Sequence, residues 1–220
     1  MMAKETDLAK VVVSWLTEQH WEVYQEVQIR SLGSVADIVA VQGPLVWVIE
    51  CKTSLSLSVM EQASSWFAHY RSVAVPSGRN RRARQAAYKV AKQFFKVGVL
   101  SVIGNAVDQI ASPPYMREYR KLALRLRDKL EPEHQTYAEA GNAEGRYWTP
   151  YKRTMRDVQR FLSANPGATM KEIQREIGRA HYASPASCRG NLGRALELWE
   201  DWCEVNRDSK PFRYYIKGHE

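Results

Sequence analysis

A run of apolar residues that carries three charges constrains this chain more than any other feature. The stretch ADIVAVQGPLVWVIECKTS, residues 36–54, has the composition of two buried strands joined by the turn residues 42–44, which are Gln-Gly-Pro. The same stretch contains Asp37, Glu50 and Lys52. Because burying an isolated charge is costly, ionised groups inside a sheet are usually paired or bound to a metal.

The turn predicts how these charges are placed across the two strands. We expect an antiparallel hairpin in which Val41 lies opposite Leu45. Counting back from that pair places Asp37 opposite residue 49, give or take one. Asp37 therefore neighbours Glu50 across the hairpin.

The residue types at these positions predict a metal site. Glu50 and Lys52 are two residues apart on one strand, so their side chains point to the same face. Two adjacent carboxylates repel unless a cation lies between them, and carboxylate oxygens suit Mg²⁺ or Mn²⁺. A lysine beside them can orient a water molecule or stabilise charge on a phosphate. The other interpretation is an exposed Glu50–Lys52 pair, with Asp37 capping a turn.

The first half of the chain predicts a mixed α/β domain. Apolar spacing over residues 5–19 indicates a helix, and alternation over residues 21–30 indicates a strand. After the charged hairpin we expect a helix over about 58–70, a strand at SVAVP, a basic helix over about 81–96 and a strand at VGVLSVI. The predicted order is αβββαβαβ, and this domain ends near residue 112.

These residues resemble a known nuclease family. Asp37, followed after twelve residues by Glu50-Cys51-Lys52, is similar to the signature of the PD-(D/E)XK nuclease superfamily. The element order matches the αβββαβ core of its restriction-endonuclease-like fold, and the resemblance covers about residues 4–104. It implies that Asp37, Glu50 and the backbone carbonyl of Cys51 bind Mg²⁺, for which Mn²⁺ can substitute. It also implies that Lys52 acts on the attacking water.

Further positions fit or depart from this resemblance. Glu5, on the first helix, is where many members carry a glutamate that supports the metal, and Gln62 is where many carry a glutamine beside the active site. Glu26, on the preceding strand, is a weaker candidate. Ala36 stands where the signature has proline, and Cys51 is unusual in its position, where its side chain should point to the opposite face.

The charge of the chain favours a polyanionic partner. Lys and Arg number 32 and Asp and Glu 24, for a net charge of +8, which points to nucleic acid before membrane. The stretch SGRNRRARQAAYKVAKQFFK carries seven cations and no acid, and phosphates would relieve its self-repulsion. A merely solvated surface is the alternative. The candidate DNA contacts in this stretch are Arg79, Arg81, Arg82, Arg84 and Lys89.

A second domain follows a connecting region. Residues 115–131 are predicted to be helical with little apolar surface, and EPEHQTYAEAGNAEG, residues 131–145, is predicted to be an interdomain linker. Three short helices and a hairpin then follow in the order of a small winged helix-turn-helix domain. The expected division of the chain is 1–112 for the nuclease-like domain, 113–147 for the helical segment and linker, and 148–220 for the winged-helix-like domain.

The second domain offers its own candidate DNA contacts. Thr169 and Ser184 are expected to cap the second and third helices, and Pro185 suits the first turn. The third helix would be the recognition helix, although winged helices also bind proteins, and Trp199 and Trp202 are expected in the core. The candidate contacts are Ser187, Arg189, Asn191 and Arg194 on that helix, and Lys210 and Arg213 on the hairpin.

The remaining features limit the class of protein. Three widely spaced cysteines without a CxxC pair argue against a disulfide framework and a zinc knuckle. The polar N-terminus and the lack of a long apolar run predict a cytoplasmic protein without a membrane partner.

Together these patterns favour a metal-dependent deoxyribonuclease, by analogy one of phage or mobile-element type. The alternatives are a non-catalytic winged-helix DNA-binding or regulatory protein on a nuclease-like scaffold, and a Holliday-junction-type resolvase acting as a homodimer.

Overall fold

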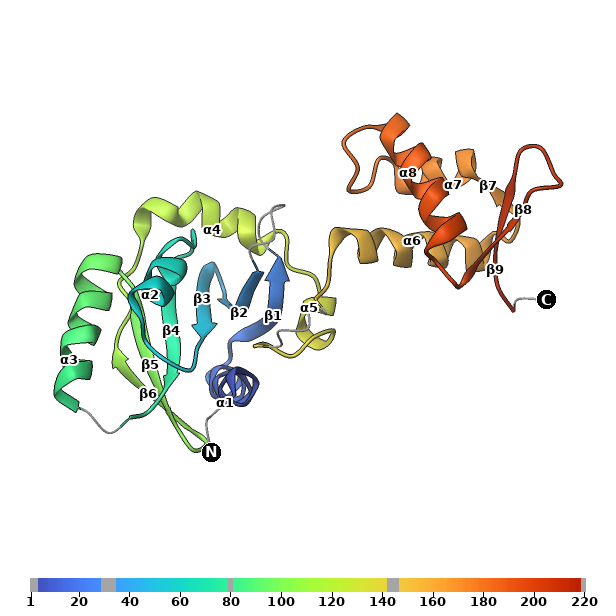
Figure 1. Cartoon of the computed structure of the whole chain (residues 1–220). Coiled ribbons are helices and arrows are strands. Elements are labelled where there is room, and N and C mark those ends of the chain that lie inside the picture. Colours follow the sequence, from blue (N-terminus) through green and yellow to red (C-terminus); the bar gives the residue numbers. More distant parts are fainter. Residues whose placement is uncertain (1–3, 29–34, 79–80, 142–146, 219–220) are drawn as a thin grey trace. The chain divides into compact units, whose positions relative to one another are not determined.

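The computed structural model describes residues 4–28, 35–78, 81–141 and 147–218 and divides the chain into two units, 1–148 and 149–220 (Figure 1). The first unit contains α1 Glu5–Glu18, β1 Glu22–Gln28, β2 Val35–Gln42, β3 Leu45–Cys51, α2 Leu57–Ser64, β4 Tyr70–Pro76, α3 Arg81–Val90, a π-helix Ala91–Phe95, β5 Gly98–Ile103, β6 Ala106–Ala111, a 3₁₀ turn Arg117–Tyr119, α4 Arg120–Arg127 and α5 Glu133–Thr136. The second unit contains α6 Pro150–Ala164, β7 Ala168–Thr169, α7 Met170–Ile177, α8 Pro185–Leu198, β8 Cys203–Asn206 and β9 Arg213–Ile216.

The first unit is built on a six-stranded mixed sheet in the order β1-β2-β3-β4-β5-β6. The β3–β4 and β4–β5 pairs are parallel and the other pairs are antiparallel. This confirms the expected α/β class. The expected order αβββαβαβ is present through β5, and the sequence analysis missed β6, which follows a turn at Gly104 with φ +55°.

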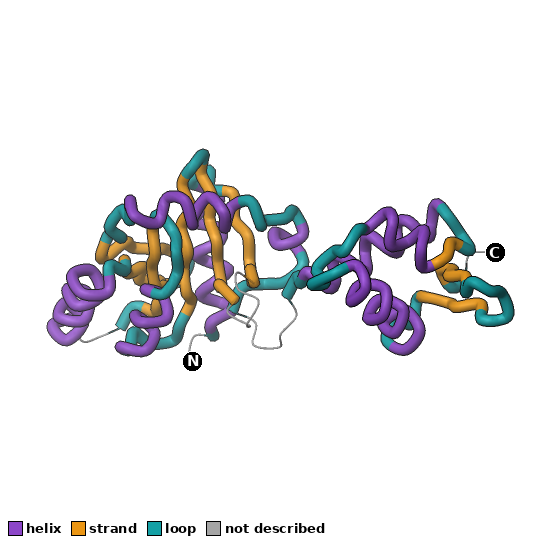
Figure 2. Tube along the Cα trace, turned by 90° about the horizontal axis from the view of Figure 1, so that it is seen from above, coloured by secondary structure: helices purple, strands orange, loops and turns teal. Residues whose placement is uncertain are grey.

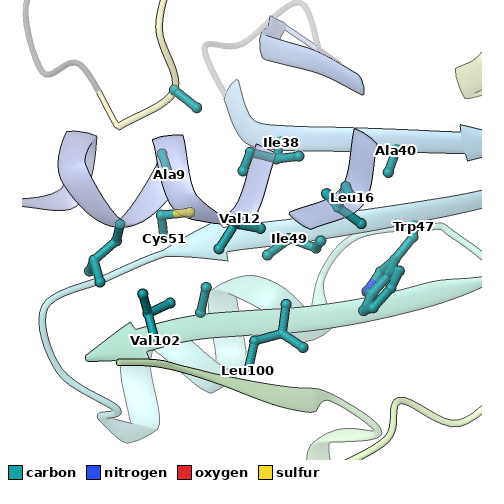
Figure 3. Packing of buried hydrophobic residues seen from close by; sticks show 13 residues of the cluster. Ala9, Val12, Leu16, Ile38, Ala40, Trp47, Ile49, Cys51, Leu100 and Val102 are labelled. Carbon is teal, nitrogen blue, oxygen red and sulfur yellow. The ribbon is translucent and has the colours of Figure 1, made fainter. Parts of the chain in front are cut away.

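Helices cover both faces of this sheet, as the apolar character of β2 and β3 requires. On one face, Val12 and Leu16 of α1 pack against Ile38, Ile49 and Cys51 (Figure 3). On the other face, α4 packs against alternate residues of the same strands, and α2 and the π-helix pack beside it. The helices therefore flank the strands in Figures 1 and 2.

The hairpin register differs by one residue from the prediction. Val41 pairs with Val46, and Gln42 pairs with Leu45, so the loop contains only Gly43 and Pro44. Gly43 has φ +55°, which the tight turn requires and glycine adopts without cost. The expected pair of Val41 with Leu45 was wrong because Gln42 was placed in the loop. The observed Ile38–Ile49 pair brings Asp37 level with the Glu50 position, within the range that the sequence allowed.

A buried arginine fixes α2 against the sheet. Arg71 of β4 is 2% exposed, and its guanidinium donates to the carbonyl oxygens of Ser64, Trp66, Phe95 and Lys96. These carbonyls end α2 and the π-helix, where backbone acceptors lack partners within the helix. Arg71 thus places the end of α2 and the following residue Trp66 relative to β4.

Residues 113–148 belong to the first unit, which differs from the expected separate helical segment and linker. Ala123 and Leu126 of α4 are buried against the sheet. Within the expected linker 131–145, α5 packs against β1, and Ala140 is 1% exposed in the core beside α1. Part of this stretch is held to β1 through the backbone amides of Ala140 and Gly141, which leave no apolar period in the sequence. Residues 142–146 lie outside the described residues.

The second unit has its own core, in which α6, α7 and α8 pack with a sheet in the order β7-β9-β8. Thr169 caps α7 as expected, its side chain accepting from the backbone of Glu172, and Ser184 caps α8 with Pro185 in the first turn. Trp199 is not in the core: it is 62% exposed, because α8 ends at Leu198 and the helical spacing stops there. Trp202 is partly buried.

Cys51, Cys188 and Cys203 are buried free thiols. Within the described residues, no helix is both long and apolar enough to cross a bilayer.

We expect Leu100→Ala to lower the free energy of unfolding by about 3 kcal/mol, because Leu100 is fully buried between α1 and the sheet. Ile103→Ala, three residues later on the same strand and 52% exposed, is the matched control and should change it by less than about 0.5 kcal/mol. Urea unfolding followed by circular dichroism measures both. Equal losses would contradict the assignment of this core.

Candidate active site

The charged residues of the β2–β3 hairpin meet around the ammonium of Lys52. Lys52 Nζ lies 3.0 Å from Asp37 Oδ2, 3.5 Å from Glu5 Oε2 and 3.6 Å from Glu50 Oε2. Three elements supply these carboxylates: α1, β2 and β3. The alternative of an exposed Glu50–Lys52 pair is wrong, because Glu50 is fully buried and Asp37 is 8% exposed.

Backbone and side-chain donors fix the two inner carboxylates. The Cys51 amide donates to Asp37 Oδ2 at 2.7 Å. Gln62 Nε2 donates to Glu50 Oε2 at 2.9 Å, and Trp66 Nε1 donates to Glu50 Oε1 at 2.7 Å. Both donors come from α2 and the residues just after it, the segment that Arg71 holds.

Trp66 is a site residue that the sequence analysis missed. It lies four residues after Gln62, a spacing at which side chains share a face of the helix predicted over about 58–70, so the pattern EQASSW contains the signal although α2 itself ends at Ser64. An indole N–H is a donor only, which suits a buried carboxylate.

Burial gives Glu50 an unusual proton affinity. Its removal from water, followed by repulsion from Asp37, raises the pKa of Glu50 from 4.5 to about 8, although Lys52 and Trp66 act in the opposite direction. Burial by itself lowers the pKa of Lys52, but attraction to Asp37, Glu50 and Glu5 outweighs it, so its pKa lies above the usual value. Lys52 therefore stays charged at neutral pH.

The Cys51 side chain points away from this cluster, as predicted. Its Sγ lies in the core against α1 (Figure 3). Burial, followed by Asp37 and Glu50, raises the pKa of the thiol well above its usual value. A neutral, buried thiol is no cation ligand, so only the backbone of Cys51 could take part in the site.

The carboxylate oxygens of this cluster are of the kind that a hard cation prefers, although the Lys52 ammonium offsets their charge in this structure. Among the described residues, Asp37 Oδ1 and Glu5 Oε1 accept no hydrogen bond, which leaves two carboxylate oxygens of the kind that Mg²⁺ prefers. No group of three or more His, Cys, Asp or Glu side chains that could hold a metal ion occurs in the described ranges. The ammonium that contacts all three carboxylates would have to give way, at least in part, to a bound ion.

Glu26 lies on β1, the strand beside Asp37, but its carboxylate is bound by the Gly141 backbone and not by Lys52. It is 7% exposed, and its Oε1 accepts from the Gly141 amide at 2.7 Å. Its φ of +49° is uncommon for a residue other than glycine.

The candidate DNA contacts of the first unit are described only in part. Arg79 lies outside the described residues, as do the side chains of Arg81, Arg82 and Arg84. Lys89, on α3, is exposed.

The candidate contacts of the second unit are all described. Arg189, Arg194, Lys210 and Arg213 are exposed. Arg189 and Arg194 of α8 line a hollow of about 790 Å³, together with Lys171 of α7 and Phe212 before β9. Arg189 Nε donates to Gln174 Oε1 at 3.1 Å, which orients it.

Other predicted side chains of the second unit have partners within the protein. Arg213 Nη1 donates to the Gly167 carbonyl at 2.8 Å. Asn191 Nδ2 donates to Ser187 Oγ at 3.1 Å. Arg194 and Lys210, in contrast, have no hydrogen bond or ion pair to another described residue, so their charges are available to a partner.

Comparisons with known proteins leave the function open. No family model and no curated protein matches the chain. The SPO1766 protein of unknown function from Silicibacter pomeroyi is a structural match at 18% identity and a TM-score of 0.39, covering 54% of this chain and 79% of that one.

We expect the free energy of unfolding to fall as the pH rises from about 4.5 to about 8 in EDTA, by at most about 1.4 kcal/mol per pH unit from Glu50. The folded protein keeps a proton on Glu50 over this range, whereas the unfolded chain releases it. Urea unfolding between pH 5 and 8 should show a steeper fall for wild type than for Glu50→Gln, which cannot titrate. Equal slopes would contradict the raised pKa.

Proposed function

We propose that this chain is a Mg²⁺-dependent nuclease of the PD-(D/E)XK type that hydrolyses DNA phosphodiester bonds. The observation that carries the proposal is the contact of Lys52 with Asp37, Glu50 and Glu5, at 3.0, 3.6 and 3.5 Å. The order α1-β1-β2-β3-α2-β4, with Asp37 on β2, Glu50 on β3 and Lys52 directly after β3, supports a restriction-endonuclease-like core.

Each residue has a distinct role in this proposal. Asp37 and Glu50 would hold Mg²⁺, with Glu50 releasing its proton as the ion binds, and with help from Glu5 and the backbone carbonyl of Cys51. Mg²⁺, when bound, would lower the pKa of a ligated water and offset charge on the scissile phosphate. The charged Lys52 would orient the attacking water or donate to a phosphate oxygen.

Gln62 and Trp66 would position Glu50 rather than act on the substrate. Their hydrogen bonds occupy both Glu50 oxygens and fix the plane of the carboxylate. Arg71 supports both donors through the end of α2.

A second candidate function is a non-catalytic DNA-binding or regulatory protein on this scaffold. The ion pairs of Lys52 favour it, because they satisfy the carboxylates without a metal. Buried ion clusters of this kind also occur for structural reasons. Metal-dependent cleavage separates the two candidates.

We further propose that the second unit binds DNA as a winged helix. The order α6-β7-α7-α8-β8-β9 and the three-stranded sheet support this assignment. The exposed Arg189 and Arg194 of α8 would contact phosphates or base edges, and Lys210 would contact phosphate from the hairpin. The apolar Phe212 and Leu198 beside them also suit a protein partner, which remains the alternative.

We expect Asp37→Asn to reduce the rate of DNA cleavage by more than about 100-fold. Loss of a residue that only hydrogen-bonds to a metal ligand already lowers metal affinity or activity by about 10- to 100-fold, and Asp37 would be a ligand itself. Supercoiled, linear, single-stranded and four-way-junction DNA should be tested with Mg²⁺, Mn²⁺ or EDTA. Asp108→Asn, at an exposed position of β6, is the matched control and should cut as wild type does.

Cleavage by Asp37→Asn at the wild-type rate would show that the site is misassigned. If wild type cuts no substrate in either metal yet still shifts DNA in a gel, the non-catalytic candidate replaces the nuclease.

We expect Arg194→Ala to weaken DNA binding and to reduce the slope of log affinity against log salt by about 1, as the loss of one phosphate contact does. Arg160→Ala is the control, because Arg160 is exposed on α6 and lines a different hollow, between α6 and α7. Fluorescence anisotropy with a labelled duplex measures both. Equal effects of the two substitutions would contradict a role for α8 in DNA contact.

A further inference from the structure

We propose that residues 137–141, here called the strap, are part of the active site, because they hold Glu5 against Lys52. In this proposal Gly141 is a positioning residue that acts through Glu5. The proposal rests on the proposed function only for what Glu5 does in catalysis, and the arrangement itself can be tested without DNA or metal.

Gly141 lies very close to the start of α1. A Cβ added to Gly141 would lie 2.7 Å from the Glu5 carbonyl carbon, 2.9 Å from the Glu5 oxygen and 2.9 Å from the Thr6 nitrogen. These are backbone atoms, which cannot rotate away as a flexible side chain would. Gly141 also has φ +77°, which disfavours any other residue. The strap backbone therefore lies directly against the backbone of Glu5.

The strap is fixed to the sheet beside Asp37. The Gly141 amide donates to Glu26 Oε1 at 2.7 Å, and the Ala140 amide donates to Gln25 Oε1 at 3.0 Å. Gln25 Nε2 in turn donates to the Gln135 carbonyl at 3.3 Å. Glu26 and Gln25 are adjacent on β1, and Ala140 is buried in the core. The strap thus joins the edge strand of the sheet to α1.

Leu8 and Ala9 anchor α1 in the core, but Glu5 lies one turn before them, at the very start of the helix. Its N-cap residue, Lys4, makes no side-chain capping hydrogen bond. The ion pair of Glu139 in the strap with Lys10 of α1 is 66% and 60% exposed, so it adds little to the backbone contacts of the strap. Since Glu5 is the first residue of α1, a shift of that turn changes the 3.5 Å separation between its Oε2 and Lys52 Nζ. The strap therefore sets the outermost of the three carboxylates.

The strain at Glu26 agrees with this role. Its left-handed φ of +49° is unfavourable for glutamate, and such conformations persist where the surroundings fix them, often beside active sites.

The test measures how fast an amine reagent modifies Lys52, with the sites read by mass spectrometry. Lys52 is held by three carboxylates and its side chain is 21% exposed, so modification in wild type should be slow. Gly141→Ala should raise the rate several-fold by displacing Glu5. Gly104→Ala is the matched control, because Gly104 also has a left-handed φ, of +55°, but a Cβ there meets nothing within 4 Å.

A double-mutant cycle distinguishes positioning from general loosening. Glu5→Gln should itself raise the modification rate, and Gly141→Ala should add nothing further in that background, because both act on the same contact. Additive effects, or equal rates in Gly141→Ala and Gly104→Ala, would overturn the proposal.

A milder variant serves if Gly141→Ala does not fold. Gln25→Leu keeps the strand but removes both hydrogen bonds of Gln25 to the chain around the strap, and it should raise Lys52 modification in the same direction. No change in that variant would overturn the proposal. These modification rates need neither metal nor DNA. If wild type fails to cut DNA, the proposed function is refuted, whereas the role of the strap is refuted only by the Lys52 modification rates.

Discussion

The candidate site depends on one ammonium that faces three carboxylates. Without Lys52, Asp37 and Glu50 would place two negative charges in a largely buried position, which is unfavourable by several kcal/mol. Even with Lys52, the pKa of Glu50 is raised to about 8. In this structure Lys52 and the high proton affinity of Glu50 offset the buried carboxylates, and the proposed function requires a divalent cation to take over that role.

The sheet and the helices packed on it place the four charged residues together. A two-residue turn sets the register that brings Asp37 to the Glu50 position, and strand alternation sends Cys51 into the core on the opposite face. Parts far apart in sequence then complete the site: α1 brings Glu5, α2 and Trp66 hold Glu50, and the strap connects β1 to α1. The residues nearest the charges are thus held by backbone contacts and buried donors.

Sequence patterns predicted the features that are fixed by residues close together in the chain. The strand composition around residues 36–54, the two-residue spacing of Glu50 and Lys52, and the caps at Thr169 and Ser184 all depend on neighbours in sequence. The sequence did not reveal that the strap packs against β1 and α1. Its contacts use backbone amides and a close glycine, which leave no pattern of apolar side chains. Trp199 was misplaced since its helix ends one residue earlier. The Arg71 contacts join β4 to helix ends and leave no periodic signal.

Locating a bound metal ion in a crystal would show whether this cluster is a metal site. Crystals soaked in Mn²⁺ should give an anomalous peak ligated by Asp37 and Glu50, with the Lys52 ammonium displaced from at least one of its present carboxylate contacts. The same soak of Asp37→Asn should give no peak there. A wild-type crystal with no peak at this position, and with Lys52 still in contact with all three carboxylates, would contradict the assignment of this cluster as a metal-dependent nuclease site.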